Sequence, residues 1–318
     1  LLSTYQGFEN LLISRLNYIG IKKTEHASKL TVIADITKNQ LKNLPDKLKI
    51  ITDIKPLVFY FKYKSLDDIR TNIESYNFKD ILIDNFVVRI NRNQNKEIQT
   101  TALEKEIGGI LYKKYKKTVS LKNPSITIVL DIIESTCFVC YSKDNINLKK
   151  RHYKIKTHSQ DISGPLAAGI LNLSGYKKYK TLIDPYANIG TLLIEATLMS
   201  KDKVYAIESS YKTIKDLEIN ASVAKVKDKI IIYNKIPKNL NKKFDFIITQ
   251  PPKNLNPKDA LKNIYNLSKK TAIISLILKD TNLKNINEKD YKLNISKIHK
   301  IIVGKTTYDI LICNQKKP

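Results

Sequence analysis

The sequence predicts an α/β protein of more than one domain, with a parallel sheet and helical crossovers in its second half. Its 318 residues are enough for two or three domains that each bury a core. Apolar segments of strand length alternate with segments of helical period, which is the pattern of a parallel sheet. One segment, 181–196, predicts a strand, a tight loop and a helix, the first turn of a nucleotide-binding sheet.

The first 148 residues predict smaller α/β units. The expected elements between 1 and 65 are a helix, a strand, a helix that ends at Pro45, and a strand, over 5–20, 30–34, 37–44 and 57–63. Ser65 opens the next helix with a good cap and an acidic first turn. The elements that follow are a strand, a helix and two strands, over 86–90, 100–115, 126–132 and around Cys137.

The segment 149–158 is polar, basic and without periodicity, which predicts a linker. Beyond it, strands and helices alternate. The expected helices cover 166–173, a segment from 191, 211–224 and 260–267. The expected strands after the opening one are 204–207, 230–233, 244–249 and 271–278, with a closing pair over 298–303 and 308–313. Gly304 marks a hairpin-like return between that pair.

The charge of the chain favours a polyanionic partner. Lys and Arg number 56 against 30 Asp and Glu, which gives a formal net charge of +26. Such a charge suits nucleic acid, because neutralising phosphates releases counterions. A lysine-rich composition is also typical of a biased genome, so the motifs have to decide between the two interpretations.

Cysteine usage and hydropathy predict a soluble, cytoplasmic protein without a metal site. Three cysteines argue against a disulfide scaffold and for a reducing compartment. Cys137 and Cys140 form a C-x-x-C inside a predicted strand, with no second Cys or His pair nearby, so we interpret both as structural. No apolar run approaches membrane-spanning length and no signal-peptide pattern starts the chain.

Three residues near the opening segment indicate a nucleoside site. Asp184 ends the first strand of the sheet, Gly190 lies in the loop after it, and Glu208 ends the second strand. An acid at that second strand end can accept hydrogen bonds from both ribose hydroxyls of a nucleoside. The loop lacks the full glycine pattern of a pyrophosphate cradle. An adenosyl group without phosphates therefore fits better than a dinucleotide.

The turn Gln250–Pro251–Pro252–Lys253 follows the fourth strand of the sheet. Proline cannot donate a backbone hydrogen bond to a neighbouring strand, so two consecutive prolines do not fit inside a β-sheet. They predict a rigid turn at the carboxyl edge of the sheet, beside the predicted pocket. The carbonyl and the Gln250 side chain of such a turn can hold a planar amine. A plain strand-ending turn is an equally open interpretation of these residues alone.

With these motifs in place, the chain resembles the THUMP-containing methyltransferases of the tRNA guanine-N2 type along essentially its whole length. The matching blocks, in chain order, are FVVRINR, TALEKEIGGIL, KRHYKIKTH, PLAAGILNLSG, DPYANIGTLLIEA and TQPPK. The resemblance implies a ferredoxin-like N-terminal module, a THUMP RNA-binding domain, a linker and a Rossmann-like class I methyltransferase domain. Their implied ranges are 1–65, 66–148, 149–164 and 165–318.

The resemblance also implies a reaction and its residues. The cofactor would be S-adenosylmethionine, and the methyl group would go to the exocyclic N2 amine of a guanine that has left its stack in tRNA. The implied cofactor residues are Pro165, Leu166, Ala167, Asp184, Pro185, Tyr186, Asn188, Gly190, Glu208 and Asn234. The implied catalytic residues are Gln250, Pro251, Pro252 and Lys253. The implied RNA-binding residues, most of them in the THUMP half that would hold the acceptor end, are Arg89, Arg92, Lys113, Lys114, Lys116, Lys117 and Arg151. We expect a monomer.

Four residues depart from the family pattern. Asn188 replaces a glycine, Asn234 an aspartate near the adenine, Gln250 an Asn or Asp, and Lys253 an aromatic residue that would stack on the target base. Asn tolerates a positive φ, so the loop at 188 can still form, whereas the lost stacking costs about 1–3 kcal/mol. An alternative hypothesis is therefore a degenerate homologue that binds tRNA without transferring a methyl group. A third is a DNA or ribosomal-RNA amino-methyltransferase.

Overall fold

The computed structural model describes residues 1–93, 97–143, 147–235, 240–252, 255, 264–280 and 293–315. The chain forms two compact units, each of them discontinuous in sequence. Unit 1 contains residues 1–3, 23–35 and 53–147, and unit 2 contains residues 4–22, 36–52 and 148–318. The predicted 1–65 module is divided between them, its strands in unit 1 and its two helices in unit 2.

Unit 1 contains two four-stranded sheets. The first has the order β2-β3-β1-β4, formed by β2 (Thr24–Ser28), β3 (Thr31–Ala34), β1 (Leu2–Ser3) and β4 (Asp53–Ile54). The second has the order β5-β8-β7-β6, formed by β5 (Leu57–Lys62), β8 (Thr136–Ser142), β7 (Ile126–Ile133) and β6 (Phe86–Asn93). Helices α3 (Leu66–Ser75) and α4 (Thr100–Tyr115) share an apolar cluster with this second sheet. Helix α4 has the predicted bounds. Strand β2 was not expected, because its sequence TEHAS is mostly polar and lacks a buried stripe.

The two cysteines of the C-x-x-C lie on opposite faces of the second sheet. Cys137 belongs to the apolar cluster that includes Ile107 of α4, and Cys140 to a second cluster that includes Leu1. Strand residues three apart point to opposite faces, so these thiols do not converge on one ligand. Burial raises the pKa of both thiols, that of Cys140 to about 12. Both cysteines lie in strand β8, as predicted, and both are buried.

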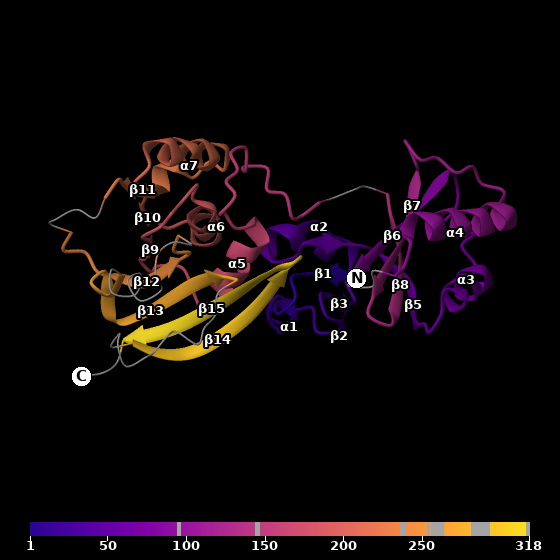
Figure 1. Ribbon diagram of the computed structural model, residues 1–318, viewed down its shortest axis with the longest axis horizontal. Helices are drawn as coiled ribbons and strands as arrows, with labels where there is room; N and C mark the ends of the chain where they lie inside the picture. The colour runs from indigo at the N-terminus through magenta and orange to yellow at the C-terminus, as the bar shows by residue number, and fades with distance from the viewer. Residues whose placement is uncertain are drawn as a thin grey trace. The chain divides into compact units, whose positions relative to one another are not determined.

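Unit 2 is built on a seven-stranded sheet with the order β11-β10-β9-β12-β13-β15-β14 (Figure 1). Its strands are β9 (Leu182–Asp184), β10 (Val204–Ile207), β11 (Ile230–Tyr233), β12 (Phe244–Thr249), β13 (Ser268–Lys279), β14 (Leu293–Val303) and β15 (Thr306–Gln315). Strands β9 to β13 run parallel to one another, and β15 runs antiparallel to both β13 and β14. The predicted parallel sheet and the return at Gly304 are confirmed, and both closing strands are longer than expected. The helix expected over 260–267 lies mostly outside the described residues.

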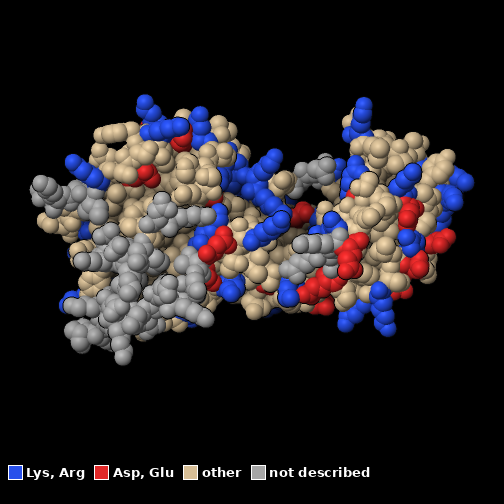
Figure 2. Space-filling model, in the orientation of Figure 1, with Lys and Arg blue, Asp and Glu red and all other residues tan. Residues whose placement is uncertain are grey.

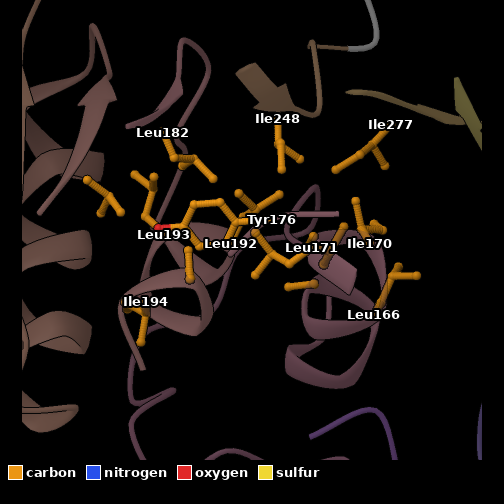
Figure 3. Packing of buried hydrophobic residues seen from close by; sticks show 14 of the residues in the cluster. Leu166, Ile170, Leu171, Tyr176, Leu182, Leu192, Leu193, Ile194, Ile248 and Ile277 are labelled. Carbon is orange, nitrogen blue, oxygen red and sulfur yellow. The ribbon is translucent and has the colours of Figure 1, made fainter. Parts of the chain in front are cut away.

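Helices α5 (Gly164–Leu173), α6 (Thr191–Ser200) and α7 (Tyr211–Val223) share one apolar cluster with the sheet, and a 3-10 turn (Lys227–Lys229) follows α7. Figure 3 shows Leu166, Ile170 and Leu171 of α5 beside Leu192, Leu193 and Ile194 of α6. Leu182, Ile248 and Ile277 from three strands complete this packing. The cluster holds the N-terminus of α6 at the carboxyl edge of the sheet.

The N-terminal helices of unit 2 are α1 (Glu9–Tyr18) and α2 (Lys38–Lys47). Thr37 and Gln40 form a capping box that starts α2. The prediction that α2 ends at Pro45 is wrong, because the helix continues to Lys47. The Leu48 amide still reaches the Leu44 carbonyl at 2.8 Å, which closes the last turn after the proline.

Phe8 packs α1 against α5. Its ring is fully buried and lies directly over Gly169, where a Cβ atom would overlap it. No helix among the described residues is both long and apolar enough to cross a membrane.

Gly169→Ala is expected to destabilise unit 2 by about 1–3 kcal/mol, because the added methyl group overpacks the Phe8 contact. Gly109→Ala in α4 is the control, since a Cβ there meets nothing within 4 Å and alanine favours a helix by about 1 kcal/mol. Calorimetric unfolding measures both changes. A Gly169→Ala protein as stable as the parent would contradict this account of the α1–α5 packing.

Candidate cofactor-binding site

A pocket of about 420 Å³ opens at the carboxyl edge of the unit 2 sheet. Parallel strands bring their carboxyl ends to one edge, and ligands of such sheets bind there. The pocket residues that carry the argument below are His158, Asp161, Asp184, Tyr186, Asn188, Thr191, Glu208, Asn234, Gln250 and Pro252. Residues predicted separately from strands β9, β10, β11 and β12 therefore line one cavity.

Asp184 is a buried carboxyl at the end of the central strand β9. It is 3% exposed. One of its oxygens accepts the Thr249 hydroxyl and, at 3.0 Å, the Tyr186 amide. Burial raises the pKa of this carboxyl to about 7, against these hydrogen bonds and with help from the negative charges of Glu208 and Asp161. The site can therefore take up or release a proton near neutral pH.

The loop after Asp184 makes two left-handed turns. Asn188 has φ 49° and Gly190 has φ 77°. The Asn188 side-chain oxygen accepts the Ile189 amide at 2.9 Å, a local bond that suits Asn in this conformation. The prediction that Asn188 can replace a glycine in this turn is confirmed. At Gly190 a Cβ would lie 2.6 Å from Leu217, so this second position is also closed by packing.

Glu208 follows β10 and connects the first two loops of the sheet. Its two oxygens accept the Asn188 amide at 3.0 Å and the Ser210 amide at 2.9 Å. Each carboxylate oxygen can accept more than one hydrogen bond, so the side chain retains capacity toward the pocket. Receipt of ribose hydroxyls by Glu208 stays a prediction.

Asn234 lies beyond β11 at the rim of the pocket. Its amide nitrogen donates to the Tyr211 hydroxyl at 3.0 Å, which connects it to the start of α7. Gln250 and Pro252 line the pocket, and Pro251 is buried. The remaining member of the predicted catalytic turn, Lys253, lies outside the described residues.

The linker before α5 supplies pocket residues that the sequence analysis missed. Asp161 accepts the Thr191 hydroxyl at 2.9 Å and forms an ion pair with Lys154. Burial raises the pKa of Asp161, and the Lys154 charge opposes that shift. The His158 Nδ1 atom lies 3.4 Å from the side-chain nitrogen Nδ2 of Asn188. These polar residues have no periodicity, and the aperiodic segment was therefore interpreted as a plain linker.

Three predicted cofactor residues lie away from the pocket lining. Pro165, Leu166 and Ala167 are buried in the first turns of α5, and the last two belong to the apolar cluster. Their contact with a cofactor stays a prediction. The same is true of a contact by Gly190, which caps α6 beside the pocket.

The predicted RNA-binding residues of unit 1 lie on β6 and at the end of α4. Arg89 faces Glu104 at 3.4 Å, and Arg92 donates to the Ile98 carbonyl. Lys114 donates to the Tyr76 carbonyl at 3.1 Å and Lys117 to the Ile83 carbonyl at 2.6 Å. Lys113 and Lys116 are exposed. Figure 2 shows basic side chains spread over both units with acidic ones among them. RNA contact by these residues stays a prediction.

Arg151, the last predicted RNA-binding residue, has an internal position in unit 2. Its side chain is 12% exposed and its Nε donates to Glu195 at 2.7 Å. An RNA contact by Arg151 was implied by the family resemblance and stays a prediction. Its partner lies 44 residues further along the chain, beyond the reach of any local pattern.

Among the described residues, no group of three or more His, Cys, Asp or Glu side chains could hold a metal ion. The strand order of unit 2, together with a strand-end acid and a pocket beside it, defines a class I methyltransferase fold. Two family models match the chain. One, an RMKL-like methyltransferase domain, covers 151–273, and the other, a THUMP domain, covers 63–141. The chain therefore contains a THUMP domain and an RMKL-like methyltransferase domain, and the curated proteins similar to it include tRNA guanine-N2-methyltransferases.

Similar curated proteins carry related names. The chain is 25% identical over 227 residues, 69% of its length, to the tRNA (guanine(10)-N2)-dimethyltransferase of Methanothermobacter thermautotrophicus. It is 26% identical over 307 residues, 91% of its length, to the ribosomal RNA large subunit methyltransferase K/L of Buchnera aphidicola. The matches span 66% and 42% of those relatives, so the chain covers less than two thirds of each.

Solved structures share the whole fold. TrmN from Thermus thermophilus superposes with a TM-score of 0.79 at 17% identity, over 99% of this chain and 98% of that one. The protein SMU.472, solved in complex with SAH, gives a TM-score of 0.77 at 15% identity, over 100% and 98%. The predicted fold class, with its THUMP and class I methyltransferase domains, is confirmed.

Asp184→Asn is expected to stabilise the protein more at pH 8 than at pH 5. The pKa of Asp184 is about 7 in the folded state and 3.8 ordinarily. Between these two pH values the folded state binds more protons than the unfolded state. The Asp184 carboxyl therefore lowers the free energy of unfolding as pH rises from 3.8 to about 7. The effect reaches about 4 kcal/mol at most, since one pKa unit is about 1.4 kcal/mol. Asparagine keeps the oxygen that accepts both hydrogen bonds. Thermal unfolding across pH measures this, and an equal shift at both pH values would contradict it.

Proposed function

We propose that this protein is an S-adenosylmethionine-dependent methyltransferase that modifies the exocyclic N2 amine of a guanine in tRNA. The observation that carries the proposal is the convergence of Asp184, Glu208, Asn234 and Gln250 on one pocket at the carboxyl edge of the sheet. The relatives named as tRNA guanine-N2-methyltransferases support the choice of substrate.

The donor set of the pocket fits an adenosyl cofactor that carries an ammonium group. Glu208 would accept the ribose hydroxyls, and the Asn234 amide would meet the edge of the adenine. Asp184 and Asp161 supply negative charge in a buried region, which suits an ammonium group. When bound, such a cofactor supplies an activated methyl group.

The protein's own contribution to the reaction is placement. The Pro251–Pro252 turn has restricted backbone freedom, so the Gln250 side chain extends from a fixed edge of the pocket. Its oxygen can accept an N–H of the target amine and hold the nitrogen lone pair in line with the methyl group. Positioning of this kind supplies much of the acceleration of a bimolecular transfer. A guanine must leave its stack to reach the turn.

The wider proposal concerns the rest of the chain. We infer domains over 1–65, 66–148, 149–164 and 165–318, with the THUMP domain and its basic residues holding tRNA by its phosphates. A monomer in the cytoplasm completes the proposal. The buried, reduced thiols of Cys137 and Cys140 suit a reducing compartment.

Ribosomal RNA is a second candidate substrate. The relative named ribosomal RNA large subunit methyltransferase K/L matches 91% of this chain, a larger share than the 69% matched by the first tRNA enzyme. The same pocket and turn would serve a guanine in either RNA, so the substrate assay must include both.

Glu208→Gln is expected to weaken binding of S-adenosylhomocysteine by about 10–100-fold, because hydrogen bonds to a charged acceptor are worth about 1.5–3 kcal/mol. Glu218→Gln is the matched control, since Glu218 pairs with Lys227 at 3.6 Å on the outside of α7. Isothermal titration calorimetry of the parent and both variants measures the affinities. Absence of binding to the parent at millimolar ligand would refute the enzyme proposal and favour the tRNA-binding alternative.

Gln250→Ala is expected to lower the methylation rate about tenfold or more while leaving cofactor affinity unchanged, because it removes an acceptor aimed at the reacting amine. Gln250→Asn should keep activity, since it retains the amide. The assay is mass spectrometry of nucleosides from tRNA and from large-subunit ribosomal RNA after incubation with protein and cofactor. N2-methylguanosine in tRNA supports the proposal, and product only in ribosomal RNA selects the second candidate. Cofactor binding without product in either RNA would indicate a homologue that no longer transfers methyl groups.

A further inference from the structure

We propose that Arg151 is a positioning residue of the cofactor pocket and not an RNA contact. It would act through its ion pair with Glu195, which sets the path of the linker that carries Asp161 into the pocket. The inference rests on the proposed function only for the identity of the ligand.

Arg151 joins three segments of unit 2. Its Nε donates to Glu195 Oε1 at 2.7 Å, its Nη1 to the Leu148 carbonyl at 3.0 Å, and its Nη2 to the Lys49 carbonyl at 2.6 Å. All three guanidinium nitrogens therefore hold internal partners: helix α6, the start of the linker and the turn after α2. An RNA phosphate would have to compete with these three partners for the N–H donors of the guanidinium group.

Glu195 is fully buried, so its side chain depends on partners inside the protein. The carboxylate oxygen that receives Arg151 also accepts the Tyr153 hydroxyl at 2.8 Å, and Tyr153 is itself 0% exposed. A buried carboxylate without a cation costs several kcal/mol. Arg151 and Tyr153 are two residues apart in the linker, so this single acid on α6 fixes the linker's first turn.

Gly164 shows how closely the ion pair is enclosed. A Cβ at this first residue of α5 would lie 2.5 Å from Arg151 Cγ and Nε and 2.8 Å from Glu195 Oε1. The backbone of α5 therefore packs directly on the pair. Helices α5 and α6 and the linker meet at this point.

The linker returns to the pocket after leaving Glu195. Lys156 exchanges two backbone hydrogen bonds with the buried Asn220 side chain of α7, at 2.9 and 3.0 Å. Asp161 then accepts the hydroxyl of Thr191, the first residue of α6, and lines the pocket. Because Glu195 and Thr191 are one turn apart on the same helix, the two attachments hold the linker in register along α6.

The test is the double variant Arg151→Met/Glu195→Gln, which leaves the net charge unchanged and avoids an unpaired buried charge. Three quantities are compared with the parent: the Kd for S-adenosylhomocysteine, amide hydrogen exchange of 154–162, and the salt dependence of tRNA binding. We expect a folded protein with about tenfold or more weaker ligand binding and faster exchange at 154–162, but an unchanged tRNA affinity. Arg70→Met is the control, since Arg70 pairs with Glu106 on the surface of unit 1.

Each result decides the proposal. Parent-like ligand binding and exchange in the double variant would overturn it and leave the pair a purely structural role. A tRNA salt slope reduced by about one, with ligand binding unchanged, would assign Arg151 to RNA contact instead. If the parent itself binds no S-adenosylhomocysteine, the proposed function fails, and the exchange of 154–162 still decides whether Arg151 positions the linker. If the double variant does not fold, Arg151→Lys is measured in its place. This substitution keeps the positive charge but removes the several N–H donors of the guanidinium group.

Discussion

The pocket depends on one constraint, the burial of a carboxyl group at the end of the short central strand. Strand β9 has three residues, all buried, and pairs on both sides with parallel neighbours. Its last residue, Asp184, is held by a hydroxyl from β12 and by the amide of its own loop. The loop then passes to Glu208 through the Asn188 amide. Three strand ends are thereby fixed relative to each other before any ligand arrives.

Two of the residues that depart from the family pattern, Asn188 and Gln250, have defined positions in this pocket. Asn188 adopts the left-handed conformation that a glycine would take, and its own side chain stabilises the turn. Its amide side chain also reaches toward His158, so the substitution adds a polar contact at the pocket where a glycine would leave space. Gln250 lines the same pocket from the end of the neighbouring strand β12. The left-handed turn of the loop is therefore retained around an altered side chain.

Local signals in the sequence predicted most elements and the strand-end residues of the site. The cap at Ser65 and the strand-loop-helix pattern at Asp184 depend on short-range interactions, and the structure has those features. The missed features depend on long-range partners. Asp161 accepts a hydrogen bond from Thr191, which begins a helix 30 residues later in the chain. Arg151 pairs with Glu195, which lies 44 residues later. A basic, aperiodic segment carries no sign of such partners, so a plain linker was the natural expectation.

The chain passes between the two units five times, after residues 3, 22, 35, 52 and 147. Helix α1, whose Phe8 covers Gly169, and the Lys49 carbonyl that receives Arg151 both come from the N-terminal segments. A catalytic fragment cut from residue 148 onward would lose both. The segment from residue 148 onward is therefore not the whole of unit 2. The covalent path thus predicts that the two halves of the chain are inherited together, and that shuffling should retain the N-terminal segments with the methyltransferase domain.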